Sequence, residues 1–215
     1  MEHNEVVKAI YKNRIVAIVR GVAPGDIVKT AQALYEGGIR LLEITFNQAS
    51  DTGIADTESS IRMVKEVLGD KMCVGAGTVM TLEQAEAAAA AGADFALAPD
   101  TNVEVIKKMV SLGMVAVPGA MTPSEIAAAH NAGADIVKLF PAGVLGLSYA
   151  KAVRGPINQV PLMAVGGIDL GNYRDFLGQG FCSVGIGGNI VKNDAIKAGR
   201  FEEITDLAKQ YTEQI

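Results

Sequence analysis

Three ionisable side chains stand within or at the end of apolar runs, where burial makes a charge costly. Lys138 lies inside residues 136–141. Glu43 lies inside residues 41–46, and Arg20 ends the first apolar run of the chain. A buried Lys either pairs with a carboxylate or loses its proton, and the neutral amine is the form that attacks a ketone. Lys138 is therefore a candidate nucleophile.

Glu43 is the natural partner of such an amine. Burial raises the pKa of a carboxyl group, which lets it give and take protons near neutral pH. A structural salt bridge between Glu43 and Lys138 is the alternative that these residue types leave open. Arg20 is a candidate for binding a carboxylate or a phosphate. The alternative is a solvated residue at the end of its strand.

Two glycine pairs follow the last two apolar runs. Gly166 and Gly167 come after one run, and Gly187 and Gly188 come after the next, with Asn189 directly behind them. Glycine lets the backbone approach a phosphate closely, although tight turns also require it. In an eight-stranded αβ barrel these last two loops frequently form a phosphate site.

Thr78 ends a segment of small residues, Gly-Ala-Gly-Thr, that we expect to be a loop after a strand at residues 72–75. Small residues there leave room for a substrate, and the Thr78 hydroxyl is a candidate hydrogen-bond partner for it. Capping the next helix is the alternative role of Thr78, but Thr81 already stands at the expected N-cap.

Apolar runs alternate with amphipathic segments along the whole chain. Most runs lack in–out alternation, which is typical of parallel strands covered on both faces. We expect strands at residues 14–20, 39–45, 72–75, 94–98, 115–118, 135–140, 162–165 and 183–186. We expect helices at residues 26–36, 82–91, 103–112, 123–131 and 170–179, with N-caps at Thr81 and Thr122 and helix ends at Gly92, Gly113 and Gly133.

Eight strands, each followed by a helix, predict a (β/α)8 TIM barrel with a short N-terminal helix. No linker divides the chain, so we expect one domain over residues 1–215. An open doubly wound sheet is the alternative, but residues 21–25 lack the glycine fingerprint that usually follows its first strand. A weak repeat, Gly-Ala-Asp, occurs at residues 92–94 and 133–135.

Composition argues against several kinds of partner. The net charge is −5 without a basic stripe or tail, which argues against nucleic acid. No run reaches the roughly 18 apolar residues of a membrane span, and the first residues are polar. Cys73 and Cys182 lie in apolar runs, so we expect buried, reduced thiols and a cytoplasmic protein. With only two histidines and no ligand cluster, we expect no metal and no cofactor.

Five segments together resemble the 2-keto-3-deoxy-6-phosphogluconate (KDPG) and 4-hydroxy-2-oxoglutarate (KHG) aldolases. The resemblance runs from about residue 14 to the C-terminus, and the segment from Lys138 to Ala142 is fairly specific. It implies a TIM barrel, a class I mechanism through a Schiff base and a homotrimer. The segments are residues 42–45, 75–78, 137–142, 166–168 and 185–188.

The resemblance also assigns roles to single residues. Lys138 matches the Schiff-base lysine, and Glu43 matches the carboxylate that transfers protons. Thr78 matches the threonine that holds the carboxylate of pyruvate, and Pro99 lies in the matching loop after the fourth strand. Arg20 matches a basic residue at the end of the first strand. The phosphate-binding backbone is matched by Gly166, Gly167, Gly187 and Gly188.

Three positions depart from the gluconate-acting members of this family. Asn47 stands where they usually carry Arg, Val165 where they carry Thr, and Asn189 where they often carry Ser. The first two changes resemble the branch that acts on the galactonate epimer. Val165 cannot hydrogen-bond a substrate hydroxyl, so the preferred C4 epimer stays open, whereas Asn189 can still donate to a phosphate.

The leading hypothesis is an aldolase that cleaves a phosphorylated 2-oxo acid to pyruvate and an aldehyde. A sugar-phosphate isomerase or epimerase on the same barrel is the first alternative, with Glu43 as base and Lys138 only as a charge. A protein that binds a sugar-acid phosphate without turnover is the second.

Overall fold

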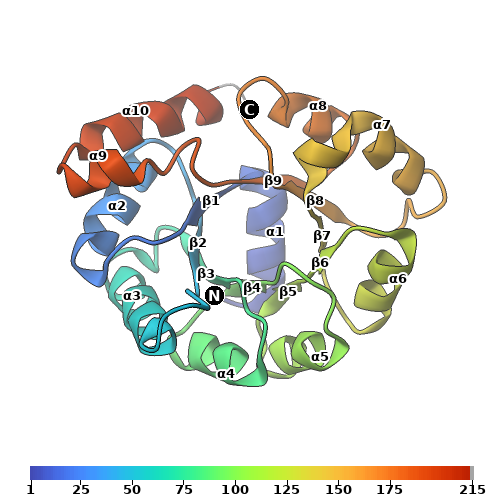
Figure 1. Cartoon of the computed structure of the whole chain (residues 1–215), viewed down its shortest axis with the longest axis horizontal. Coiled ribbons are helices and arrows are strands. Elements are labelled where there is room, and N and C mark those ends of the chain that lie inside the picture. Colours follow the sequence, from blue (N-terminus) through green and yellow to red (C-terminus); the bar gives the residue numbers. More distant parts are fainter. Residues whose placement is uncertain (214–215) are drawn as a thin grey trace.

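The computed structural model describes residues 1–213 as a ring of parallel strands enclosed by helices (Figure 1). All strand pairs are parallel, in the order β5-β4-β3-β2-β1-β9-β8-β7-β6. The strands are β1 (Ile15–Val19), β2 (Leu41–Thr45), β3 (Cys73–Gly77), β4 (Phe95–Leu97), β5 (Val115–Val117), β6 (Gly119–Ala120), β7 (Val137–Leu139), β8 (Leu162–Val165) and β9 (Ser183–Ile186).

The two ends of this strand order are halves of one strand. β5 pairs with β4 and β6 pairs with β7, and only Pro118 separates β5 from β6. Pro118 has no N–H to donate, which interrupts the ladder, but its carbonyl oxygen accepts from Lys138 N at 2.8 Å. The ring is therefore closed with eight strands, and the predicted TIM barrel is confirmed.

Helices follow the strands around the outside of the ring (Figure 1). Thr81 and Thr122 cap their helices as predicted, and Thr122 forms a capping box with Glu125. Gly92, Gly113 and Gly133 follow helices at positive φ, as expected of helix ends. The helices are α1 (His3–Asn13), α2 (Pro24–Glu36), α3 (Gly53–Leu68), α4 (Leu82–Ala90), α5 (Val103–Ser111), α6 (Pro123–Asn131), α7 (Ala142–Arg154), α8 (Tyr173–Gly178), α9 (Asn193–Lys197) and α10 (Phe201–Thr212).

One predicted helix begins late. We expected it from Leu170, whereas α8 begins at Tyr173. The side chain of Asp169 accepts from Gly171 N at 2.8 Å, and the side chain of Asn172 accepts from Asp169 N at 3.0 Å. These local bonds satisfy the backbone in a turn and replace the first helical turn.

α1 closes the end of the barrel where the strands begin. Its Val6 and Ile10 are buried and pack in a cluster with residues of the barrel interior, among them Val16, Leu41 and Phe95. A second and larger cluster fills the space between the strands and the outer helices. With one end sealed by α1, the opposite end is the only one through which a substrate can reach the interior of the described barrel.

The small residues of β3 are part of the strand, so the predicted loop at residues 75–78 is wrong. β3 extends to Gly77, and only Thr78 follows it. A Cβ on Gly75 would lie 2.3 Å from the ring of Phe95, and one on Gly77 would collide with the carboxyl group of Glu43. These glycines therefore make room for neighbouring side chains inside the barrel rather than for a substrate.

The Gly-Ala-Asp repeat proves to be structural. Asp94 accepts from Val74 N and from Lys65 Nζ, both at 2.8 Å. Asp135 accepts from Ala116 N at 3.0 Å, and its other oxygen lies 2.8 Å from His3 Nε2. Each Asp thus ties the start of its own strand to a neighbouring strand at the end of the barrel that α1 closes.

Two further expectations concern the core and the helices. Cys73 and Cys182 are buried free thiols, as predicted. Within residues 1–213, none of the helices is both long and apolar enough to cross a bilayer.

Candidate active site

A cavity of about 530 Å³ lies at the carboxyl ends of the strands. In a barrel of this kind, that is the end where loops carry catalytic groups. The cavity unites ten of the twelve residues that the sequence singles out. They are Arg20, Thr78, Pro99, Lys138, Val165, Gly166, Gly167, Gly187, Gly188 and Asn189.

Lys138 is on β7 and points into this cavity from a buried position. Only 5% of its surface is exposed, and its Nζ lies 5.1 Å from the centre of the Phe140 ring. Desolvation lowers the pKa of Lys138, Glu43 opposes this effect, and Arg20 adds to it. Burial thus favours the neutral amine, which carries the lone pair that a nucleophile needs.

Glu43 is on β2 and is more deeply buried, with 1% of its surface exposed. Desolvation raises its pKa, and the positive charges of Lys138 and Arg20 oppose the rise. Its Oε2 is enclosed and has no hydrogen-bond partner within the described residues. An enclosed carboxyl oxygen without a partner is unusual in a folded protein and is typical of a site where protons move.

Glu43 and Lys138 influence each other's pKa but form no ion pair within the part of the chain that the structure describes. A salt bridge would have fixed both groups in their charged forms. Without one, burial pushes both toward the neutral forms, an acid and an amine. The missing ion pair therefore favours a catalytic role for Glu43 and Lys138 over a structural salt bridge.

Arg20 and Thr78 face each other at the rim. Arg20 Nη2 lies 3.4 Å from Thr78 Oγ1, and Arg20 is exposed. Thr78 has φ of 57°, a left-handed conformation that is strained for a β-branched residue. It caps no helix, because Thr81 accepts from Gln84 N at 3.1 Å and caps α4. The Thr78 hydroxyl and the Arg20 guanidinium together suit a carboxylate.

The glycine pairs line the same cavity in the loops after β8 and β9, and β9 is the neighbour of β1, the strand that Arg20 follows. Gly166 and Gly167 have φ of 88° and 73°, which only glycine adopts without strain. Among the described residues, no hydrogen bond uses the backbone N–H groups of Gly167, Ile168, Gly188 or Asn189. Free N–H groups on adjacent loops form a concave site for an anion such as a phosphate.

The three departures from the family pattern lie in different surroundings. Val165 is buried on the cavity wall, where its methyl groups lie against Gly185. Asn189 also lines the cavity, but its Nδ2 donates to Ile168 O at 2.8 Å. Asn47 does not line the cavity. Its side chain accepts from Ala49 N at 3.1 Å and belongs to a separate hollow beside β1 and β2.

Sequence reasoning missed four residues of the lining: Ile18, Phe140, Ile168 and Gly185. Ile18 and Gly185 stand two positions before Arg20 and Gly187, and Phe140 stands two positions after Lys138. Side chains two apart on a strand share a face. Period-two counting from the chosen residues would therefore have found three of the four.

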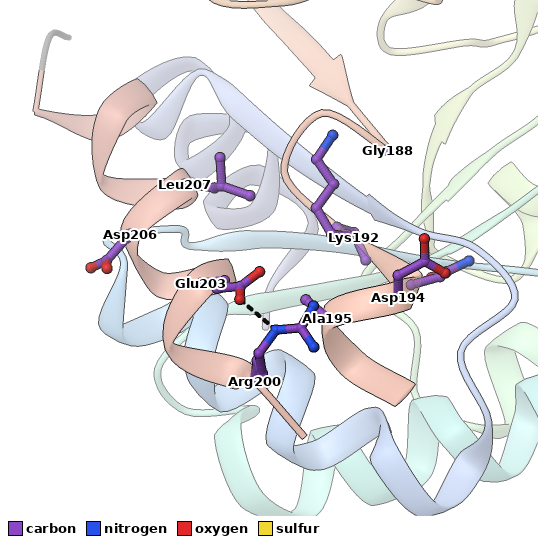
Figure 2. Close-up of a pocket in the computed structure, with 10 residues that line it drawn as sticks. Gly188, Lys192, Asp194, Ala195, Arg200, Glu203, Asp206 and Leu207 are labelled. Carbon is purple, nitrogen blue, oxygen red and sulfur yellow. Dashed lines mark hydrogen bonds and ion pairs between the residues drawn. The ribbon is translucent and has the colours of Figure 1, made fainter. Parts of the chain in front are cut away.

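A larger hollow of about 670 Å³ lies behind Gly188, between the loop after β9 and α10 (Figure 2). Arg200 and Glu203 point toward each other there and form an ion pair. The charged residues of this hollow are all exposed to solvent. This larger hollow contains neither Lys138 nor Glu43, whereas the smaller cavity is lined by Lys138.

Comparisons with known proteins agree with this geometry. The family model for KDPG and KHG aldolase matches residues 6–207. The 2-dehydro-3-deoxy-phosphogluconate aldolase of Treponema pallidum (strain Nichols) is 33% identical over 206 residues, 95% of this chain and 95% of that protein. The 2-dehydro-3-deoxy-6-phosphogalactonate aldolase of Escherichia coli (strain K12) is 29% identical over 202 residues, 94% of this chain and 96% of that protein.

A solved structure agrees as well. The KDPG aldolase of Legionella pneumophila, with pyruvate captured at low pH as a covalent carbinolamine intermediate, matches with a TM-score of 0.84 and 28% identity. The match covers 99% of this chain and 98% of that one.

Proposed function

This chain belongs to the KDPG and KHG aldolase family, and we propose that it is a class I aldolase acting on a phosphorylated 2-oxo acid. The substrate is a 2-keto-3-deoxy-6-phospho-sugar acid, either the gluconate compound or its galactonate epimer. The products are pyruvate and glyceraldehyde 3-phosphate. The same chemistry converts 4-hydroxy-2-oxoglutarate to pyruvate and glyoxylate, and it needs no cofactor because Lys138 itself forms the electron sink.

The observation that carries this proposal is the state of Lys138. It is buried on a strand, reaches the cavity, and has no ion pair among the described residues. A structural lysine in such a place would be paired, since an unpaired buried charge destabilises the fold. The lowered pKa supports a neutral amine that is ready to attack a carbonyl carbon.

The reaction begins when Nζ of Lys138 adds to the C2 carbonyl of the substrate. Glu43 moves protons, directly or through water, while the carbinolamine loses water to give an iminium. Glu43 then takes the proton of the C4 hydroxyl, and the electrons of the C3–C4 bond move into the iminium. The aldehyde leaves, the enamine gains a proton at C3, and water releases pyruvate from Lys138.

The two anionic ends of the substrate fit the two sides of the cavity. We assign the carboxylate to Thr78 and Arg20, which approach each other at 3.4 Å. We assign the phosphate to the N–H groups of the glycine loops after β8 and β9, with Asn189 beside them. Pro99 lines the same cavity after β4, the strand that pairs with β3. Asn47 has no assigned contact, because its hollow is a separate one.

Val165 bears on the choice of epimer. Its methyl groups stand on the wall beside Lys138, where a threonine hydroxyl would recognise the C4 hydroxyl. Val165→Thr should therefore shift kcat/KM toward the gluconate epimer by about tenfold, the size of one hydrogen bond to a hydroxyl. Parallel assays on both epimers check this shift, and an unchanged ratio would remove Val165 from the specificity determinants.

The finer features of the protein are also proposals. The family resemblance supports a homotrimer of a cytoplasmic protein, in which residues 1–215 act as one barrel domain. Sedimentation equilibrium measures the oligomeric state, and a mass of one protomer at micromolar concentration would contradict the trimer.

Borohydride reduction in the presence of pyruvate, followed by peptide mass mapping, tests the proposed reaction. We expect a reduced pyruvyl adduct on Lys138 and none on the Lys138→Arg protein. A folded wild-type protein that forms no adduct would overturn the aldolase. Retained turnover in the Lys138→Arg protein would instead favour an isomerase, in which this residue supplies only charge.

A further inference from the structure

Side-chain amides donate to backbone carbonyl groups at the mouth of the cavity, three of them from residues outside its lining and one from Asn189, which belongs to the lining. In each case an amide N–H donates to a carbonyl oxygen of a residue that lines the cavity. The pairs are Gln48 with Thr78 at 2.8 Å, Asn172 with Gly167 at 2.9 Å, Asn189 with Ile168 at 2.8 Å and Asn193 with Arg20 at 3.1 Å. A carbonyl oxygen is partially negative, so a free one on this wall would oppose an anionic substrate.

The amide of Asn172 is oriented by two hydrogen bonds. Its Oδ1 accepts from Asp169 N at 3.0 Å, and its Nδ2 donates to Gly167 O at 2.9 Å. An amide has one accepting end and two donor hydrogens, so the first bond determines which end meets Gly167. Asn172 thereby links the turn before α8 to the glycine loop after β8.

This bond determines where the glycine loop directs its N–H groups. In a planar trans peptide, the C=O and the next N–H point to opposite sides. Gly143 N donates to Gly166 O at 2.7 Å, and Asn172 donates to Gly167 O. Both carbonyls are therefore held on one side, and the N–H groups of Gly167 and Ile168 point to the other. Two successive glycines at positive φ would otherwise be free to rotate these peptides.

Thr78 is held by a longer relay at the other side of the mouth. Gln48 Nε2 donates to Thr78 O at 2.8 Å, and Gln48 Oε1 accepts from Gln84 Nε2 at 2.8 Å. Gln84 is buried, and its Oε1 accepts from Met80 N at 2.7 Å, which orients the whole relay. The relay thus holds Thr78 in its strained conformation, with the hydroxyl near Arg20.

We propose that Asn172 and Gln48 are positioning residues that adapt the two sides of the cavity mouth to two separate anions. Asn172 holds the carbonyl group of Gly167 away from the phosphate, so that only N–H donors of the glycine loop face it. Gln48 holds Thr78 so that its hydroxyl meets a carboxylate. The inference rests on the proposed function for the identity of the two anions, and neither amide touches the substrate.

The test uses two probes, one for each side of the mouth. Calorimetry measures the affinity for inorganic phosphate, and borohydride trapping measures the pyruvate concentration that half-saturates Lys138. Asn172→Ala and Asn172→Asp remove the donor, and Asp keeps the acceptor for Asp169 N. Gln48→Ala removes the relay to Thr78. Asn13→Ala is the matched control, because Asn13 Nδ2 donates to Ala9 O at 2.9 Å on α1 at the closed end.

We expect the two effects to be separate. Both Asn172 variants should bind phosphate about tenfold more weakly and trap pyruvate within about twofold of wild type, because the N–H of Ile168 is no longer held toward the anion. Gln48→Ala should need about tenfold more pyruvate and bind phosphate normally. Asn13→Ala should change neither probe.

Four results would overturn the proposal. The first is an unchanged phosphate affinity in Asn172→Ala, and the second is a weaker phosphate affinity in Asn172→Asp alone. The third is a loss of phosphate binding and of pyruvate trapping together in each variant. The fourth is a wild-type protein that binds no phosphate. Weakening in the Asp variant alone would indicate simple charge repulsion, and joint loss would indicate a general structural role. A wild-type protein that traps no pyruvate refutes the aldolase instead, and the phosphate measurement still tests Asn172.

Discussion

The two ends of this barrel treat buried charge in opposite ways. At the closed end, Asp94 is 3% exposed in its side chain and is bound by Lys65 Nζ and Val74 N, both at 2.8 Å. At the open end, Glu43 and Lys138 are buried to a similar degree, yet they form no ion pair within residues 1–213. One end pairs its buried charges, and the other leaves a buried acid and a buried amine without an ion pair.

The difference shows which end serves the fold and which serves the chemistry. A paired and hydrogen-bonded carboxylate stays charged and holds strands together. A buried acid and amine without a direct partner keep protonation states that are able to change during a reaction. Such groups cost stability, and they persist where a function requires them.

The largest expected effect comes from removing the reactive amine. Lys138→Met should lower kcat by about 10⁴-fold or more, because the covalent route is lost. The same change should leave Tm unchanged or raise it by about 2–4 °C, because an unpaired buried amine is replaced by an apolar chain. Steady-state kinetics and thermal unfolding check both parts. A clear fall in Tm would mean that Lys138 holds the fold together.

Glu43→Gln should have the next largest effect. The amide keeps the shape of the side chain but cannot transfer a proton, so kcat should fall by about 10²–10³-fold. The limb of the pH–rate profile that reports Glu43 should disappear, and pyruvate should still be trapped slowly on Lys138. A variant that keeps both its rate and its full pH profile would show that Glu43 carries no proton.

A substitution at the closed end should lower the stability of the fold and leave the catalytic rate unchanged. Asp94→Ala leaves Lys65 Nζ and Val74 N without their acceptor, which should cost about 3 kcal/mol of unfolding free energy. Chemical denaturation measures this loss, and kcat per folded molecule should stay within about twofold of wild type because the site lies at the other end. A large fall in kcat in folded protein would contradict this separation of the two ends.

The smallest effect concerns His3, which joins α1 to Asp135. The hydrogen bond and the charge of Asp135 raise the pKa of His3. A raised folded-state pKa stabilises the protein fully below the ordinary His value of about 6.5 and loses this effect as pH rises through the folded-state pKa. His3→Gln should therefore lower Tm by about 1–2 °C at acidic pH and by less at alkaline pH. Equal shifts at both pH values would show that the charge of His3 does not stabilise the fold.

Local signals in the sequence were sufficient for most elements. The predicted strands at residues 162–165 and 183–186 and the helix at residues 123–131 match β8, β9 and α6 at both ends. Apolar runs, capping residues and glycines after helices act over a few residues, so they can be read along the chain. The same runs placed Lys138 and Glu43 on strands and the glycine pairs in loops, and the cavity unites most of these positions.

Tertiary structure decided what depends on neighbours that are distant in sequence. Gly75 and Gly77 are required by Phe95 and Glu43, which belong to adjoining strands, so the need for glycine at these two positions was not visible locally. Asn47 turned out to serve its own turn in a separate hollow, because its side chain bonds to Ala49 N. The amides of Gln48 and Asn172 carried no motif, and only folding brings them to Thr78 and Gly167.

The sequence by itself therefore determined the barrel and the identities of the reactive groups, because burial patterns and residue types are local properties. Only the tertiary structure decided that Glu43 and Lys138 lie near each other without an ion pair, and that the N–H groups of the two glycine loops have no hydrogen-bond partner among the described residues. Both features depend on distances and orientations between separate strands and loops. Such quantities exist only once the chain has closed into a ring.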